Sequence, residues 1–229
     1  MTSLQKWGKS VRTTIPVMAG YLVLGAGFGI LLRTRGYGLG WALAMSAFIY
    51  AGSMQYVAID LLTGGASLLT TAVTTLLVNA RHLFYGISML ERYRAAGRYA
   101  PYLIFSLTDE TYSLVAARED LTGAECFRIS LLDQLYWALG TALGSLAGAY
   151  LDFNTTGIDF SLTALFLTVF TEQWLETKDH APALIGLGVS IVCRLLFGAD
   201  SFLLPTRGGM LCCLLVLDAR RTKKGGESV

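Results

Sequence analysis

The sequence predicts an all-α integral membrane protein, a polytopic helical bundle of roughly 6–8 spans with broken or re-entrant helices and a weak internal repeat. The composition is one reason. Of 229 residues, 54% are hydrophobic and 15% are charged, whereas soluble domains carry about 25% charged residues. The long apolar runs are another, because a membrane β-barrel would show short alternating segments. A net charge of +2 gives no broad basic face, so we expect no nucleic-acid partner.

The apolar residues form a series of candidate spanning segments, since a helix needs about 20 mostly apolar residues to cross the hydrocarbon core. The segments cover residues 15–32, 39–62, 66–90, 100–117, 129–151, 160–175, 182–198 and 201–218. The second segment is interrupted by the run YAGSMQ (50–55), and its glycine weakens a helix.

Small residues mark two helix faces that suit close packing. Gly25 and Gly29 form a GxxxG pattern in the first segment, and Gly140, Gly144 and Gly148 form a stripe on the fifth. Such faces let helix backbones approach each other in lipid. We expect helix–helix contacts there, within the chain or with a second subunit, and a substrate-lining role is the alternative.

Basic residues near the ends of the segments predict the orientation of the chain. A basic arm at residues 1–14 and a basic tail at residues 219–229 are both expected in the cytoplasm. The single transmembrane domain between them, residues 15–218, would then cross the membrane an even number of times. The linker LDFNTTGID (151–159) has acidic but no basic residues and is expected outside.

Two linkers conflict with a simple series of crossings. ERYRAAGRY (91–99) and AAREDLTGAECFR (116–128) are both basic and are both expected inside. A full crossing by residues 100–117 would place them on opposite sides. We therefore expect some segments to be broken or re-entrant, which is tolerated where the backbone is buried in protein or lines a cavity. Counts of six, seven and eight spans stay open.

A weak internal repeat is visible in two pairs of runs. FIYAGSMQ (48–55) aligns with FLTVFTEQ (166–173), and VNARHLFYG (78–86) aligns with VCRLLFG (192–198). Duplicated halves are common in transporters, and the substrate site lies where they meet. Chance alignment of apolar runs is the alternative. The corresponding halves would cover residues 15–117 and 129–218.

Asn79, Arg81 and His82 are unexpected in an apolar segment, because an ionisable group at the bilayer centre costs about 2.5–3.5 kcal/mol on insertion scales. Snorkelling to the headgroups explains one such residue but not readily three together. Arg81 needs an acceptor, and Asp109 and Glu110 form the nearest acidic cluster. We therefore predict an ion pair of Arg81 with Asp109 or with Glu110.

The run YAGSMQ predicts a helix break that frees backbone groups inside the membrane. The N–H groups at a helix N-terminus suit a carboxylate, and an amide side chain both donates and accepts. These groups fit a zwitterionic amino acid. We predict substrate contacts from Tyr50, Gly52, Ser53, Gln55 and Asn79. An unbroken helix with a small-residue packing face is the alternative.

Other polar and sulfur-containing residues are given structural roles. Polar residues such as Asp60, Asp133, Gln134, Glu172, Gln173, Arg194 and Arg207 are expected to be interfacial or paired within the protein. The cysteines lack CxxC spacing and are expected to be buried apolar side chains. They are Cys126, Cys193, Cys212 and Cys213.

The runs YAGSMQYVAI (50–59), NARHLFYG (79–86) and IFSLTDETYS (104–113), with GAGFGILL (25–32), closely resemble the AzlC-type branched-chain amino-acid permeases. That family is the large subunit of a two-component bacterial exporter, and the resemblance covers residues 10–218. It implies a carrier of valine, leucine and isoleucine in the bacterial plasma (inner) membrane, with methionine as a further candidate. It also implies a small AzlD-like membrane subunit as partner.

The resemblance implies no ATPase module and no cofactor, and the sequence has no phosphate-binding loop of the G-x-x-x-x-G-K-[ST] type. Transport would therefore draw on an ion gradient, with protons as the first candidate. Asp109, Glu110 or His82 would carry the coupling proton, and rocking of the two halves would expose the site to each side in turn. A higher oligomer is left open.

Two other functions compete with a carrier. One is a channel or a structural subunit of a membrane complex. The other is an intramembrane metal-dependent enzyme built on His82, Asp109 and Glu110, although His82 and His180 stand in no HExxH or similar spacing. We expect a transporter and not an enzyme.

Overall fold

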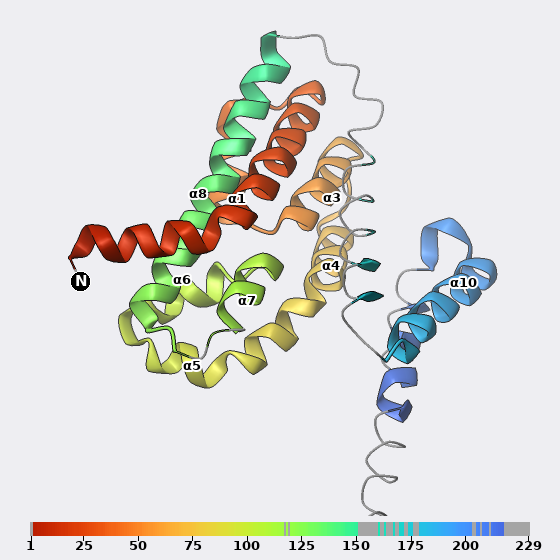
Figure 1. The fold of residues 1–229 in the computed structure, drawn as a ribbon. Coiled ribbons are helices and arrows are strands. Elements are labelled where there is room, and N and C mark those ends of the chain that lie inside the picture. Colours follow the sequence, from red (N-terminus) through yellow and green to blue (C-terminus); the bar gives the residue numbers. More distant parts are fainter. Residues whose placement is uncertain are drawn as a thin grey trace, which may run out of the picture. The chain divides into compact units, whose positions relative to one another are not determined.

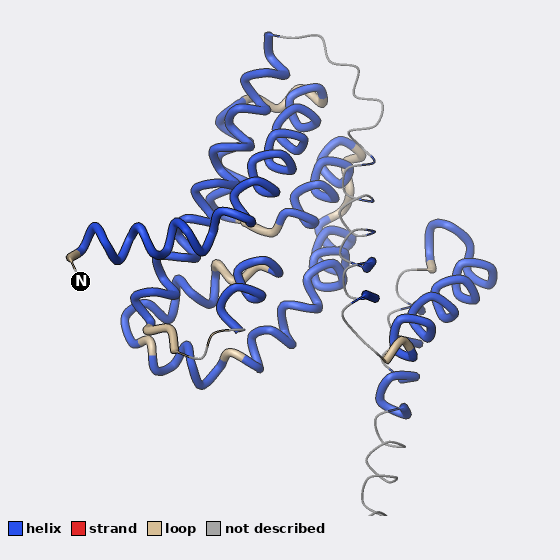
Figure 2. The backbone as a smooth tube through the Cα atoms, in the orientation of Figure 1, coloured by secondary structure: helices blue, strands red, loops and turns tan. Residues whose placement is uncertain are grey.

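The computed structural model describes residues 2–116, 118, 120–150, 179–202, 205–206, 208–210 and 212–217, and isolated positions between 160 and 175. Every regular element among these residues is helical (Figure 2), which confirms the all-α prediction. The chain divides into two compact units, Met1–Thr163 and Ala164–Val229.

The helices of the first unit follow one another with short connections (Figure 1). In chain order they are α1 (Ser3–Thr34), α2 (Leu39–Phe48), α3 (Gly52–Thr63), α4 (Leu68–Ser88), α5 (Leu90–Ala95), the 3-10 helix η1 (Gly97–Tyr99), α6 (Ala100–Phe105), α7 (Asp109–Ala116) and α8 (Gly123–Tyr150). At about 1.5 Å per residue, α1, α4 and α8 are each long enough to cross a hydrocarbon core of about 30 Å.

In the described part of the chain, two helices are both long and apolar enough to span a membrane by length and composition. One is α1, whose Leu4–Thr34 stretch has a mean hydropathy of 2.0. The other is α10 (Ala181–Ser201) in the second unit, with a value of 1.9 over Ala181–Gly198. The number of spans therefore stays a prediction.

Helices α1 and α8 lie side by side and run in the same direction (Figure 1). Near their starts, the Lys9 ammonium lies 3.7 Å from a Glu125 carboxylate oxygen. Near their ends, a Cβ built on Gly148 would lie 3.2 Å from the Cβ of Arg33. The first unit thus has two ends along α1 and α8. The end near Lys9 is called the basic end, and the end near Arg33 is called the opposite end.

The glycine faces predicted from the sequence meet between these two helices. A Cβ on Gly25 would lie 2.9 Å from the Trp137 carbonyl oxygen, and a Cβ on Gly140 would lie 2.7 Å from that of Leu22. Gly144 is pressed against the backbone of Ala26 in the same way. The close approach confirms helix–helix packing within the chain as the role of these glycines.

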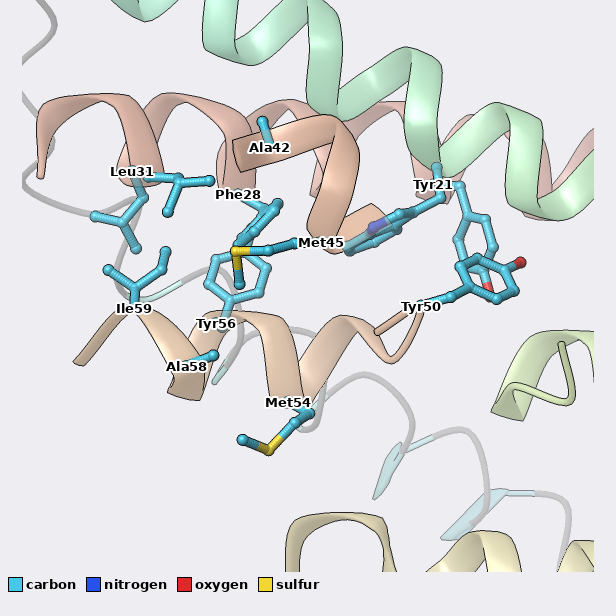
Figure 3. Close-up of a cluster of buried hydrophobic side chains, with 12 residues drawn as sticks. Tyr21, Phe28, Leu31, Ala42, Met45, Tyr50, Met54, Tyr56, Ala58 and Ile59 are labelled. Atoms are coloured by element: carbon cyan, nitrogen blue, oxygen red, sulfur yellow. The ribbon is translucent and has the colours of Figure 1, made fainter. Parts of the chain in front are cut away.

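Helices α2 and α3 form a hairpin that enters from the opposite end and returns to it. In the last turn of α2, the Ser46 carbonyl accepts a hydrogen bond from the Gln134 amide of α8 at 3.4 Å. After the break, the Tyr56 hydroxyl of α3 donates to the Leu24 carbonyl at 2.8 Å. Ile59, one turn later, packs in the cluster that contains Leu31, near the end of α1 (Figure 3).

Helices α6 and α7 form a second hairpin, which enters from the basic end. On the way in, the Tyr102 hydroxyl of α6 donates to the Gln134 side-chain oxygen at 2.6 Å. On the way out, the Arg92 guanidinium donates to the Val115 carbonyl of α7 at 2.6 Å. Arg118, just beyond α7, donates to the Thr13 hydroxyl in the first turns of α1 at 2.9 Å.

The two hairpins explain the conflict between the basic linkers. Arg92 of the first linker and Arg118 of the second lie at the same end of the first unit, because the segment between them turns back. Both 39–62 and 100–117 are broken into two helices that turn back within the first unit, as expected for some of the segments, and the number of membrane crossings stays a prediction. The basic end carries the residues for which the sequence predicts a cytoplasmic location.

Each hairpin is anchored by its own apolar cluster. Figure 3 shows the cluster between α1, α2 and α3, where Phe28 and Tyr56 have ring centroids 5.6 Å apart. A second cluster joins α5, α6 and α7 to the start of α8 and includes Leu103 and Ile129. On the outer side of α8, large apolar residues recur at helical spacing and are exposed, as on a lipid-facing surface. They are Leu135, Leu139, Leu143 and Leu146.

In the second unit, α10 changes direction at Gly198, whose φ of 74° lies in the left-handed region. Cys193 is buried, as is Cys126 in the first unit, but Cys212 and Cys213 are exposed. The expectation of four buried cysteines is therefore wrong for this pair, because no described residue covers their helical turn.

Several expectations concern residues outside those described. They are the linker at 151–159, most of the run FLTVFTEQ (166–173), Glu172, Gln173, Arg207 and the tail at 219–229. The repeat, with its halves 15–117 and 129–218, stays a prediction.

Candidate functional site

The tips of the two hairpins meet inside the first unit, and this meeting point is the candidate site. The α2–α3 break lies at Tyr50, whose φ of 36° is left-handed and strained for a residue with a side chain. The Tyr50 ring is buried, with its centroid 6.4 Å from that of Phe105 at the tip of the other hairpin. Figure 3 shows Tyr50 and Tyr21 extending toward one another from different elements.

The α3 helix starts at the break with no side chain capping its N-terminus. Gly52 is its first residue, and a Cβ there would lie 3.0 Å from the Trp137 ring, so only glycine fits without displacing that ring. The first N–H groups of a helix have no partner within the helix. An uncapped, partly buried N-terminus therefore presents donors that an anionic group can accept from.

The α7 helix starts differently, because Thr108 caps it. The Thr111 amide donates to the Thr108 hydroxyl at 3.3 Å, and the Tyr112 amide donates to the Thr108 carbonyl at 2.9 Å. Asp109 and Glu110 follow in the first turn, where negative charge is favoured by the helix dipole. The site therefore pairs a helix start rich in free donors with a helix start that carries carboxylates.

Arg81 of α4 links the two tips. Its guanidinium donates to the Ser53 hydroxyl on α3 at 2.8 Å and lies 2.8 Å from a carboxylate oxygen of Asp109 on α7. Of the two pairings predicted from the sequence, the one with Asp109 is present. The side chains of Arg81 and Asp109 are 30% and 39% exposed, so part of the site is open to its surroundings.

Glu110 has a different partner from the one expected. Its carboxylate accepts a hydrogen bond from the Tyr21 hydroxyl of α1 at 2.7 Å. His82 lies beside the ion pair on α4, with Nδ1 3.2 Å from the Asn79 carbonyl oxygen and its ring edge-to-face with Tyr85. The structure thus brings Arg81 and both carboxylates to the hairpin tips.

Two amide side chains of the predicted site have polar atoms without a partner. Gln55 is completely buried, and neither its oxygen nor its nitrogen bonds to a described residue. The side-chain oxygen of Asn79 is buried in the same condition. A buried polar group without a partner costs about 1–3 kcal/mol. Such groups are expected where a ligand or water completes the hydrogen bonding.

The sequence reasoning missed two members of this region. Tyr21 lies in an apolar run, where a tyrosine carries no distinctive signal. Asp133 is expected to be interfacial or paired; the structure buries it completely and gives it a partner, the Thr111 hydroxyl, which donates at 2.9 Å. The interfacial alternative is wrong, because the α6–α7 hairpin covers this turn of α8. The feature of the sequence that could have identified Asp133 is a carboxylate within an apolar segment.

Comparison with known proteins places this geometry in a family context. The family described as "AzlC protein" matches residues 16–151. The "Branched-chain amino acid transport protein AzlC" of Bacillus subtilis (strain 168) is 44% identical over 209 residues, which is 89% of this chain and 82% of the relative. An "Uncharacterized membrane protein" of Helicobacter pylori (strain ATCC 700392 / 26695) is 44% identical and covers 89% of this chain and 91% of the relative.

The "Inner membrane protein YgaZ" of Escherichia coli (strain K12) is more distant, at 26% identity over 90% of this chain and 87% of the relative. No solved structure matches the chain.

Proposed function

The chain belongs to the AzlC protein family, and from this membership we propose that it is a secondary transporter that exports branched-chain amino acids. The name of the Bacillus relative supports a transport role and a branched-chain substrate. Valine, leucine and isoleucine are the proposed substrates, with methionine as a further candidate. The names of the relatives also support a membrane location, which we propose to be the bacterial plasma membrane with both termini in the cytoplasm.

The observation that carries the proposal is the meeting of two hairpin tips at one arginine. Arg81 contacts the uncapped start of α3 through Ser53 and the acidic start of α7 through Asp109. The two helix starts therefore differ in charge preference while lying within reach of one side chain. A free amino acid carries the matching pair of charges.

The substrate carboxylate is proposed to bind at the start of α3. The first N–H groups of α3, at Gly52 and Ser53, are not capped by a side chain and would donate to it there, and the Gln55 amide adds a further donor and acceptor. The substrate ammonium is placed toward Asp109, where an anionic group favours it. The rings of Tyr50 and Phe105 offer an apolar wall to the aliphatic side chain.

Proton coupling and a partner subunit complete the proposal. The sequence has no phosphate-binding loop for ATP, and Glu110 and Asp109 stand beside the proposed site, so an ion gradient is the proposed energy source and the proton its carrier. The small AzlD-like subunit is proposed as partner on the strength of the family. Because Arg81 links the tips of the two hairpins, we propose that the tips separate when the substrate site opens.

Exchange of labelled leucine in proteoliposomes tests the function. The protein is reconstituted alone and together with its small subunit, and the liposomes are loaded with unlabelled leucine. A carrier accumulates labelled leucine by saturable counterflow, which a channel or a structural subunit does not. Absence of counterflow with and without the small subunit, under conditions where the protein is folded and inserted, would refute the proposal.

A further inference from the structure

A continuous chain of hydrogen bonds joins Glu110 to Asp133 through three hydroxyl groups. The Tyr21 hydroxyl lies 2.7 Å from a Glu110 carboxylate oxygen and 2.7 Å from the Thr108 hydroxyl. The Thr108 hydroxyl lies 3.1 Å from the Thr111 hydroxyl, which lies 2.9 Å from a carboxylate oxygen of Asp133. The chain therefore crosses from α1 to α7 and on to α8, and both of its ends are acidic.

The number of hydrogens available to this chain of hydrogen bonds shows whether Glu110 and Asp133 can both be ionised. It contains four oxygen–oxygen contacts at hydrogen-bond distance but only three hydroxyl groups. Each hydroxyl supplies one hydrogen. If both carboxyl groups were ionised, one contact would bring two oxygens together with no hydrogen between them. A proton on either carboxyl group supplies the missing hydrogen and satisfies every contact.

We infer that Glu110 and Asp133 share one proton along this chain, and that Asp133 is the inner proton-binding residue of the transporter. Two arrangements satisfy all four contacts. In one, protonated Glu110 donates to Tyr21, and each hydroxyl donates in the direction of Asp133. In the other, protonated Asp133 donates to Thr111, and each hydroxyl donates in the direction of Glu110.

Passage between the two arrangements moves one proton with no net change in the hydroxyls. Glu110 loses its proton to Tyr21, Tyr21 gives its own to Thr108, Thr108 gives its own to Thr111, and Thr111 gives its own to Asp133. One O–H bond breaks at Glu110 and one forms at Asp133. Membrane transporters use relays of acidic side chains in this way.

The burial of Asp133 favours the proton at that end of the chain of hydrogen bonds. The residue is completely buried, and its second carboxylate oxygen has no partner among the described residues. An ionised carboxylate in that condition is costly. Glu110, in contrast, follows directly on Asp109, which is paired with Arg81. The titratable or charged groups that face this pair of acids are Tyr21, Tyr50, Tyr85, Tyr102, Asp109 and Arg81.

The inference rests on the proposed function for its role in coupling, but the shared proton can be measured without transport. Infrared spectra of the purified, substrate-free protein should contain a carboxylic-acid C=O band that shifts in heavy water. Asp133→Asn and Glu110→Gln each add an amide that can donate into the chain and replace the shared proton. We therefore expect either substitution alone to remove the whole band. A wild-type spectrum without it, or two bands of which each variant removes one, would overturn the shared proton.

Transport measurements then test the chain as the route. Tyr21→Phe and Thr111→Val interrupt it and leave both acids in place, so they should reduce pH-driven leucine efflux by about tenfold or more, the scale expected for loss of a proton-transfer group. Counterflow, which needs no net proton movement, should be kept. Tyr56→Phe is the matched control, since that hydroxyl donates to the Leu24 carbonyl and lies outside the chain.

The outcomes separate the two proposals. If both interrupting variants keep wild-type pH-driven efflux and its pH profile, the relay is wrong while the transporter stands. If the wild-type protein shows no leucine counterflow, the transporter is wrong, and the infrared result still decides whether the proton is shared.

Discussion

The Arg81 guanidinium of α4 lies 2.8 Å from the Asp109 carboxylate of α7. This ion pair links α4 to the tip of the α6–α7 hairpin. The same guanidinium donates to Ser53 at the tip of the other hairpin. One side chain therefore holds together two elements that enter the first unit from opposite ends. If this link breaks, each tip is free to move with its own hairpin.

Reversal of either charge tests the pair. Arg81→Asp and Asp109→Arg each place two like charges where the ion pair stood, so each should lower the melting temperature, and the exchanged double variant should restore it. Each should reduce leucine counterflow by about tenfold or more, since 1.4 kcal/mol of lost binding is a factor of about ten. The exchanged double variant should recover part of the counterflow. Inactive single variants with an equally inactive double variant would count against the pairing.

The Gln55 side chain, near the start of α3, is predicted to serve transport while lowering the stability of the protein. Gln55 is completely buried and lacks a partner among the described residues. Gln55→Leu removes the unsatisfied amide and should stabilise the protein by about 1 kcal/mol, within the usual cost of such groups. Leucine counterflow should fall sharply. Thermal unfolding and counterflow of the same preparation check both effects, and a destabilised variant would indicate a structural hydrogen bond instead.

The packing of α1 against α8 predicts different effects of substitution at two glycines, Gly144 and Gly20, which look alike in the sequence. A Cβ on Gly144 would meet the backbone of Ala26, so Gly144→Ala should destabilise the protein. Gly20, also helical, has nothing within 4 Å of the corresponding position. Gly20→Ala should therefore be neutral or stabilising by up to about 1 kcal/mol, through helix propensity alone. Equal effects of the two substitutions on thermal unfolding would contradict the helix contact.

The hairpins make a prediction about membrane sidedness. Arg98 and Asp120 flank the α6–α7 hairpin, and Arg35 and Thr63 flank the α2–α3 hairpin. Single cysteines at the first two positions should react with an impermeant thiol reagent from the same side of the membrane. Cysteines at the other two should both react from the other side. Labelling of positions 98 and 120 from opposite sides would mean that residues 100–117 cross the membrane.

The sequence was informative wherever a residue type is costly inside lipid. Gly52 and Ser53 predicted the break before α3, and the cost of an unpaired Arg81 predicted its acidic partner. The conflict between two basic linkers predicted a segment that turns back. These inferences need only local chemistry and the charge distribution.

The direction of the chain after each break could not be predicted in this way. Whether α3 continues from α2 or returns depends on packing against α1, for example on the bond from Tyr56 to the Leu24 carbonyl. The role of Asp133 was missed for a related reason. Its position near one end of a segment suggested an interface, but a distant part of the chain, the α6–α7 hairpin, covers it.

The central claim is that a small zwitterion enters the space between the hairpin tips. Its most direct test is thiol labelling in a variant whose four natural cysteines are replaced, with single cysteines at positions 50–55 and 79–82 and a lipid-facing control at Leu135. We predict that an aqueous reagent modifies cysteines at Gln55 and Asn79, and that leucine slows this reaction but not the reaction at exposed Arg98. If every position in both ranges resists the reagent in the inward- and outward-facing forms, no substrate reaches the tips and the account is contradicted.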